Sequence, residues 1–146
     1  MQTQDSIGVT GGLDIKLFDE RGVLKVHQRT HNTVTAVGKA YIADRLGLQA
    51  QALMSNMAVG TGTPSSTALG TEVSRGVFQS QTSSGATWTY VGSWDIEDNF
   101  SATLTEAGVF NADSRLGGTM LCSASFAGIV KAVNDSLVIT WVITIS

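Results

Sequence analysis

Residues 137–145 read Leu137-Val138-Ile139-Thr140-Trp141-Val142-Ile143-Thr144-Ile145, a run dense in β-branched and aromatic residues. Such residues fit a pleated sheet, and a continuous apolar run of this kind is typical of a strand with neighbours on both sides. The run is far shorter than the roughly 20 apolar residues of a membrane-spanning helix. The sequence therefore predicts a central strand here and no membrane association.

The rest of the chain repeats shorter stretches of strand-like character, separated by turn residues. Gly76 interrupts one of them and is expected to mark a bulge. The expected strands start roughly 8–12 residues apart and do not alternate with helices. This spacing is typical of an antiparallel β-sandwich or a jelly-roll-like barrel, and here it predicts about eight strands. We expect the other strands at Leu13–Phe18, Val23–Thr30, Met54–Val59, Glu72–Ser80, Thr87–Trp94, Phe100–Phe110 and Thr119–Phe126, with Val130–Asn134 opening the last hairpin.

A single segment, residues 33–47, has helical periodicity. Asn32 or Thr33 could cap its N-terminus by accepting backbone hydrogen bonds, and Gly47 follows its last turn as a terminating glycine should. The apolar positions that share one face at helical spacing are Val34, Val37, Ala40 and Tyr41.

The composition of the chain excludes some classes of function. The chain has 146 residues, a net charge of −3 and only 14% charged residues, with more serine and threonine than charged side chains. Phosphate binding needs clustered Lys and Arg, so a basic nucleic-acid-binding surface is excluded. One cysteine gives no intrachain disulfide framework. The composition favours a β-rich protein whose surface is covered by other proteins.

We expect one domain over residues 13–146, preceded by a flexible arm over residues 1–12. The arm is polar, aperiodic and rich in glycine, and has no features of a signal peptide, so we expect synthesis in a cytoplasm. It is either a frayed terminus or a segment that becomes ordered on a partner. In the second case, the partner-binding residues are Gln2, Thr3, Gln4, Asp5, Ser6, Ile7 and Val9.

Three motifs could carry chemistry, but each has a simpler interpretation. The segment Gly60–Pro64 lacks the lysine and the following helix that a phosphate loop requires, so we expect a surface turn. His27 and His31 straddle the end of a strand and have no third ligand at zinc spacing. Cys122 lies in an apolar stretch and is expected to act as a small buried hydrophobe.

Acidic and aromatic residues near the middle of the chain offer further alternatives. Asp95, Glu97 and Asp98 could bind calcium or act in glycoside hydrolysis, but they also suit a solvated loop. Aromatic residues at alternate strand positions are most often core, as expected for Trp88, Trp94 and Trp141, although they could serve as ligand platforms. No Gly-x-Ser-x-Gly motif is present. We expect no catalytic residues, no metal and no cofactor, with a glycan-binding or glycan-cleaving module as a minor alternative.

Three segments together carry a family resemblance. They are His31–Val34 with Tyr41–Leu46, then Met57–Pro64 with Thr67–Glu72 and Arg75, and finally Leu104–Asn111 with the strand at residues 137–141. Over roughly residues 13–146, where the apolar periodicity runs, the chain resembles the small virion structural proteins of tailed bacteriophages.

The resemblance implies a non-enzymatic protein of the virion, assembled in the host cytoplasm. It favours a capsid decoration, or cement, protein that forms a homotrimer and clamps neighbouring major capsid subunits on the outer shell. The N-terminal arm would then add to a sheet of the capsid. The alternative is a tail-associated protein, either a fibre-anchoring or a tail-tip module, with a tail protein as its partner.

Overall fold

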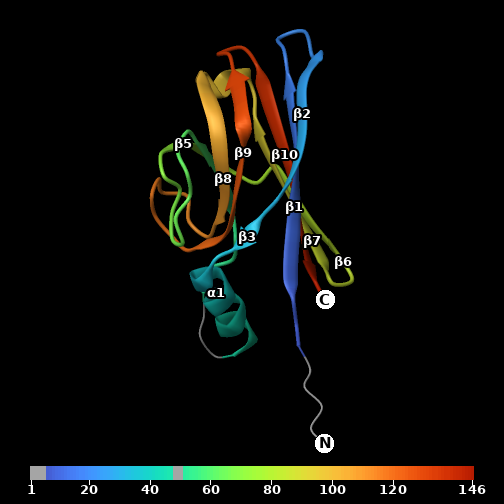
Figure 1. The fold of residues 1–146 in the computed structure, drawn as a ribbon, viewed down its shortest axis with the longest axis vertical. Coiled ribbons are helices and arrows are strands. Elements are labelled where there is room, and N and C mark those ends of the chain that lie inside the picture. The colour runs from blue at the N-terminus through green and yellow to red at the C-terminus, as the bar shows by residue number, and fades with distance from the viewer. Residues whose placement is uncertain (1–5, 48–50) are drawn as a thin grey trace, which may run out of the picture.

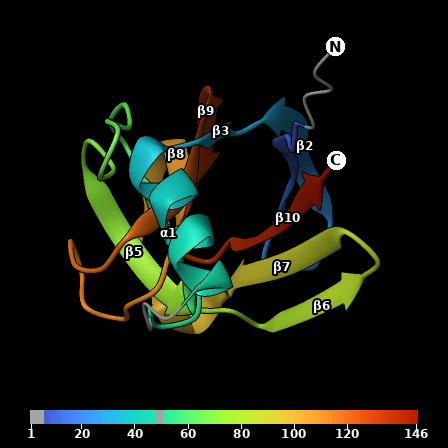
Figure 2. The ribbon, with the colours of Figure 1, turned by 90° about the horizontal axis from the view of Figure 1, so that it is seen from below.

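The computed structural model describes residues 6–47 and 51–146 and consists of two antiparallel sheets packed face to face, with one α-helix (Figure 1). Five strands form each sheet, in the order β2-β1-β10-β7-β6 in sheet A and β3-β9-β8-β4-β5 in sheet B. Figure 2 shows the two sheets on either side of the core, with α1 at one end. The predicted mainly β architecture, an antiparallel sandwich with one helix, is confirmed.

The described residues form ten strands rather than about eight. One extra strand comes from Thr33–Val34, predicted as helix, and another from Ser80–Ser84, which overlaps a predicted polar turn. The strands are β1 (Val9–Phe18), β2 (Leu24–His31), β3 (Thr33–Val34), β4 (Asn56–Gly60), β5 (Glu72–Val77), β6 (Ser80–Ser84), β7 (Thr87–Trp94), β8 (Ala102–Phe110), β9 (Met120–Lys131) and β10 (Ser136–Ile145); α1 spans Ala36–Leu46 and a 3-10 turn, η1, spans Ile96–Asp98.

The strand predicted to be central, β10, is the middle strand of sheet A. It pairs with β1 along its whole length and with β7 on its other side. Its alternate side chains point into the sandwich, where Trp141 and its neighbours are fully buried. The residues of β10 in the main core are Leu137, Ile139, Trp141 and Ile143.

Two local predictions on strands are wrong. The register of β5 against β4 is regular at Gly76, which pairs with Met57, and the irregularity lies instead at Val59/Gly60. The segment Val130–Asn134 does not open a hairpin, because β9 continues to Lys131 in sheet B and β10, after the turn, belongs to sheet A.

Helix α1 begins later than predicted because its cap is Thr35, not Asn32 or Thr33. The Thr35 hydroxyl accepts a hydrogen bond from the Gly38 N–H (2.8 Å) and donates to the Met120 carbonyl (2.7 Å). These bonds fix the helix start against β9. The helix ends at Leu46, with Gly47 next, as expected. Among the described residues, no helix has both the length and the apolar character needed to cross a membrane.

The N-terminal boundary also differs from the prediction. β1 begins at Val9, so residues 9–12 belong to sheet A and not to an arm. The reason is the length of β10, which offers partners as far as the pair Val9–Ile145. Reciprocal bonds between Gly8 and Ser146 extend the ladder by a further residue.

The turn between β9 and β10 is held by a buried carboxylate. Asp135 accepts hydrogen bonds from the Lys25 ammonium (2.6 Å) and from the Ala132 N–H (2.9 Å). Burial opposes ionisation of Asp135, but these bonds outweigh it, so its pKa lies below the usual 3.8. The charge therefore links the β1–β2 hairpin to the β9–β10 turn.

We expect Asp135→Asn to lower the free energy of unfolding by about 1–2 kcal/mol at neutral pH, because a charge-assisted pair is lost. A carboxylate with a lowered pKa stabilises the fold above its unfolded-state pKa, and this contribution is lost as the pH falls through the folded-state value. The difference in the free energy of unfolding between wild type and variant should therefore disappear below pH 3.8. Urea unfolding across pH tests this, with the exposed Asp113→Asn as control; a gap that stays constant in acid would contradict it.

Candidate functional site

An exposed apolar patch lies where sheet A extends past sheet B, at the end that carries both termini (Figure 1). We call Ile7, Val9, Trp88, Ile143 and Ile145 the terminal patch: Ile7, Trp88 and Ile145 are its exposed members, Val9 is half-buried, and Ile143 is buried and joins the patch to the main core. The register places Val9 opposite Ile145, and Ile143 opposite Trp88, so these side chains share one face of the sheet. Ile7 is 77% exposed and Trp88 38% exposed. Contiguous exposed apolar side chains of this kind mark interaction surfaces.

A shallow depression of about 170 Å³ forms part of the terminal patch, between the β6–β7 turn and the end of β10. Trp88, Ile143 and Ile145 form the apolar part of its lining. The small residues Gly85 and Ala86 of the β6–β7 turn also line it. Its shape and apolar lining suit a single aliphatic or aromatic side chain from a partner protein.

Two of the sequence-predicted partner residues contribute to the terminal patch. Val9 lies opposite Ile145, Ile7 precedes it by two residues, and Ser6 and Ile7 are exposed. The other four, Gln2, Thr3, Gln4 and Asp5, lie outside the described residues.

The tryptophans divide between core and surface. Trp94 and Trp141 are fully buried, as predicted, whereas Trp88 is partly exposed because sheet B does not reach the outer part of β7. The alternation in the sequence correctly predicts that Trp88 shares a face of β7 with Trp94. At this end of β7, however, sheet B does not cover that face.

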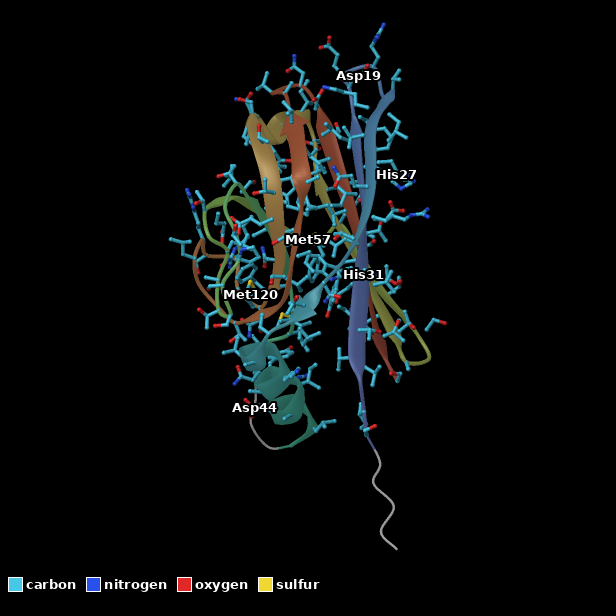
Figure 3. All side chains as sticks on the ribbon, viewed as in Figure 1. Asp19, His27, His31, Asp44, Met57 and Met120 are labelled. Atoms are coloured by element: carbon cyan, nitrogen blue, oxygen red, sulfur yellow. The ribbon has the colours of Figure 1, made fainter. Side chains whose placement is uncertain are left out.

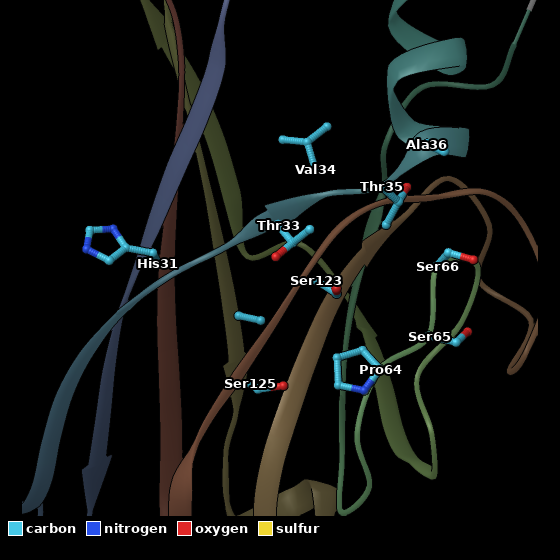
Figure 4. A pocket seen from close by; sticks show the side chains of 11 residues that line it. His31, Thr33, Val34, Thr35, Ala36, Pro64, Ser65, Ser66, Ser123 and Ser125 are labelled. Carbon is cyan, nitrogen blue, oxygen red and sulfur yellow. The ribbon is translucent and has the colours of Figure 1, made fainter.

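A second hollow, a cleft of about 490 Å³, opens between the start of α1 and the loop that follows β4 (Figure 4). His31 and Thr33 lie on one side, Ser65 and Ser66 on the other, and Ser123 and Ser125 of β9 lie between them. His31 is the sole ionisable residue among those that line it. The cleft therefore offers hydroxyl groups to a polar partner.

The glycine-rich loop after β4 is organised by one buried side chain, Glu106. One carboxylate oxygen accepts hydrogen bonds from the N–H groups of Gly62 and Thr71 (2.8 Å each), and the other accepts from Gly70 (2.7 Å). Backbone donors that a phosphate loop would turn towards its ligand are thus bonded to the protein's own carboxylate. The loop also covers a small second core made of Ala58, Leu69, Phe110 and Met120.

Sequence reasoning assigned no role to Glu106 or to Arg75. The Arg75 guanidinium is buried, makes two hydrogen bonds to the Glu72 carboxylate, and lies 3.8 Å from the centre of the Phe110 ring. It also donates to the carbonyls of Ala112 and Gly117, which fixes the β8–β9 loop. The available signal was the single charged residue of β8, Glu106, and in β5 the pair Glu72 and Arg75, three residues apart.

The predicted metal candidates are separate in the structure. His27 and His31 are both exposed on β2, and His27 contacts Asp14 on the neighbouring strand (Figure 3). Asp95 and Asp98 form a capping box at the start of the short turn η1: the Asp95 carboxylate accepts from the Glu97 N–H, and the Asp98 carboxylate accepts from the Asp95 N–H. Within residues 6–47 and 51–146, no three His, Cys, Asp or Glu side chains form a metal-binding group.

Cys122 is buried in the main core, as predicted for a small hydrophobe. Burial raises the pKa of its thiol far above the ordinary value. The thiol is therefore neutral and enclosed at physiological pH.

No family model, curated protein or solved structure matches this chain.

Proposed function

We propose that this chain is a structural protein of a phage particle, and that it acts as a capsid decoration protein. As a homotrimer on the outer shell, it would clamp neighbouring major capsid subunits. The observation that carries the proposal is the terminal patch, which combines exposed apolar side chains with the N-terminal residues. An apolar patch next to a chain end suits a protein that docks on a much larger neighbour.

The rigidity of the surface loops also supports an assembly role. Glu106 fixes the loop after β4, and Arg75 fixes the loop between β8 and β9. Loops that are ordered before binding lose less conformational entropy in the complex, so more of the contact energy is available for affinity. The hydroxyl-rich cleft adds polar contacts that need no charged partner.

A tail-associated role is the alternative, and the exposure of Trp88 favours it. A half-exposed tryptophan is suited to contact a tail protein or a host glycan, because its ring binds apolar surfaces while its N–H can donate a hydrogen bond. In this case, the same patch would anchor a fibre or form part of the tail tip.

Localisation in the particle tests both roles. Cryo-electron microscopy of the phage that encodes this chain should show density for the sandwich at three-fold and quasi-three-fold positions of the capsid. Density in the tail would replace the decoration role by the tail-associated one. A purified particle that lacks this chain would contradict both.

We expect deletion of residues 2–6 to weaken binding to undecorated capsids by about tenfold or more, because a trimer multiplies the loss of each arm contact. The thermal unfolding temperature should stay unchanged, since the first ladder pair of sheet A lies beyond the deletion, at Gly8 and Ser146. Co-sedimentation with capsids measures the binding. Saturation of capsids by the truncated protein at wild-type concentrations would refute the role of the arm.

A further inference from the structure

Sheet A has two open edges close to the terminal patch. β2 pairs with β1 only from Gly12 onward, so Ile7–Gly11 have no strand on the side away from β10 among the described residues. On the opposite edge, β6 pairs with β7 alone. At this end the sheet is therefore four strands wide, in the order β1-β10-β7-β6.

The hydrogen-bond pattern shows which backbone groups point outward at the β1 edge. In an antiparallel ladder, residues alternate between facing one neighbour and facing the other. Gly8 exchanges bonds with Ser146 on β10, so Ile7 and Val9 turn their N–H and C=O groups to the open side. The Gly11 carbonyl follows the same alternation and accepts from the Asn32 N–H.

The same reasoning applies at the β6 edge. The Ile145 N–H donates to the Ala86 carbonyl, which turns Ala86 and Trp88 towards β10 and Thr87 and Thr89 towards β6. Their partners, Ser84 and Thr82, therefore face β7, and the residues between them, Gln81 and Ser83, turn their backbone groups outward.

These two edges lack the features that keep sheet edges apart. Proteins commonly protect an edge with charged side chains or proline. The third edge of sheet A, β2, carries Lys25, His27, Arg29 and His31. Residues 6–12 and 80–84 contain neither a charged residue nor a proline. The unprotected edges are thus suited to pairing with another strand.

We propose that residues 7–10 of one copy pair with β6 of a second copy, which continues sheet A from one subunit into the next. β1 and β6 run in opposite directions, because each neighbour in the order β1-β10-β7-β6 is antiparallel. A second copy in the same orientation therefore continues the antiparallel alternation. The partner that these edges fit is this chain itself.

One register satisfies the outward groups on both edges. With Ile7 opposite Ser83 and Val9 opposite Gln81, both pairs make reciprocal backbone bonds. A shift by two residues in one direction would require Gly11, whose carbonyl is already bonded to Asn32, and a shift in the other would place Val9 opposite Gln79, whose N–H already donates to the Val91 carbonyl. In the proposed register, Ile7 and Val9 lie on the same face of the joined sheet as Trp88, so the terminal patch spans the junction.

Pairing of one edge with a different edge is head-to-tail, and such contacts form a ring when the rotation closes. Three copies joined in this way would form the homotrimer of the proposed function. The inference rests on the trimeric state in that proposal.

A disulfide tests the register directly. Thr10 and Ser80 would lie opposite each other in a non-hydrogen-bonded pair, with Cα atoms about 4.5 Å apart. The double variant Thr10→Cys/Ser80→Cys should, on oxidation, give covalent dimers and trimers in non-reducing gels. The control Thr10→Cys/Gln81→Cys directs the second thiol to the opposite face and should remain largely single chains. Native Cys122 is buried and is present in both.

A proline variant tests the junction independently. Gln81→Pro removes an outward N–H that makes no bond within the subunit, and should raise the dissociation constant of the trimer by about tenfold or more. Arg29→Pro makes the same change on the charged edge β2 and should leave the trimer intact. Sedimentation velocity measures the mass, and circular dichroism verifies the fold.

The outcomes separate the inference from the proposed function. A wild-type protein that is monomeric, or a trimer without the Thr10–Ser80 crosslink, overturns the inference. Crosslinking by either single cysteine variant would indicate a symmetric junction and also overturns it. A crosslinked trimer that does not bind capsids upholds the inference and contradicts the decoration role.

Discussion

Replacing Glu106 by glutamine is expected to lower the free energy of unfolding by about 3–5 kcal/mol, because one buried carboxylate serves several backbone donors. The amide keeps one oxygen acceptor but presents an NH₂ group to the remaining N–H donors. Gly62, Gly70 and Thr71 therefore cannot all remain bonded. Backbone N–H groups left buried without a partner cost about 1–3 kcal/mol each.

Guanidinium unfolding gives the global effect, and amide hydrogen exchange gives the local one. Exchange at Gly62, Gly70 and Thr71 should accelerate more than exchange in β10, since the loop loses its anchor while sheet A stays intact. Glu97→Gln is the matched control, because that side chain is exposed and should change stability by less than about 0.5 kcal/mol. An equal, small effect for both variants would show that Glu106 does not hold the loop.

The segments that carry the phage resemblance meet in space. Glu106, from the segment around β8, binds the loop from the segment around β4. His31, Thr33 and Val34, from the first segment, face the same loop across the hydroxyl-lined cleft. These segments thus meet on sheet B, whereas residues 137–141 lie in β10 of sheet A. The terminal patch also lies on sheet A, and its residues are outside the segments that carry the resemblance.

Alternation and turn chemistry predicted most of the strands because both act locally. Leu137–Ile145 required no tertiary information to be recognised as a central strand. The start of α1 did require it, since Asn32, Thr33 and Thr35 are all competent caps. The choice was made by the Met120 carbonyl, 85 positions away in the chain, which accepts from the Thr35 hydroxyl.

The candidate site was less predictable, for the same physical reason. Glu106 acquires its role only when a loop more than 30 residues earlier folds over it. Gly11 and Gly12 have poor strand propensity, which favoured an arm, yet pairing with β10 overrides it. The outward groups of β6 depend on the register of two ladders, and a sequence without a register cannot show them.

The contact between α1 and β9 gives a second large expected effect. Replacing a glycine by alanine inside a helix normally stabilises it by about 1 kcal/mol. At Gly38 the same substitution should instead lower the stability of the protein. An added Cβ would lie 2.0 Å from the Leu121 carbonyl oxygen and 2.8 Å from its carbon, which are backbone atoms of β9 and cannot rotate away.

We therefore expect Gly38→Ala to destabilise the protein by about 2–3 kcal/mol, the usual cost of overpacking a rigid contact. Relief requires α1 to move outward, which breaks the bonds from Thr35 to Met120 and Leu121. Gly47→Ala at the other end of α1 is the control, because no atom lies within 4 Å of its added Cβ. Thermal and urea unfolding of both variants measure the difference, and a stabilised Gly38→Ala would mean that α1 does not pack against β9 in this way.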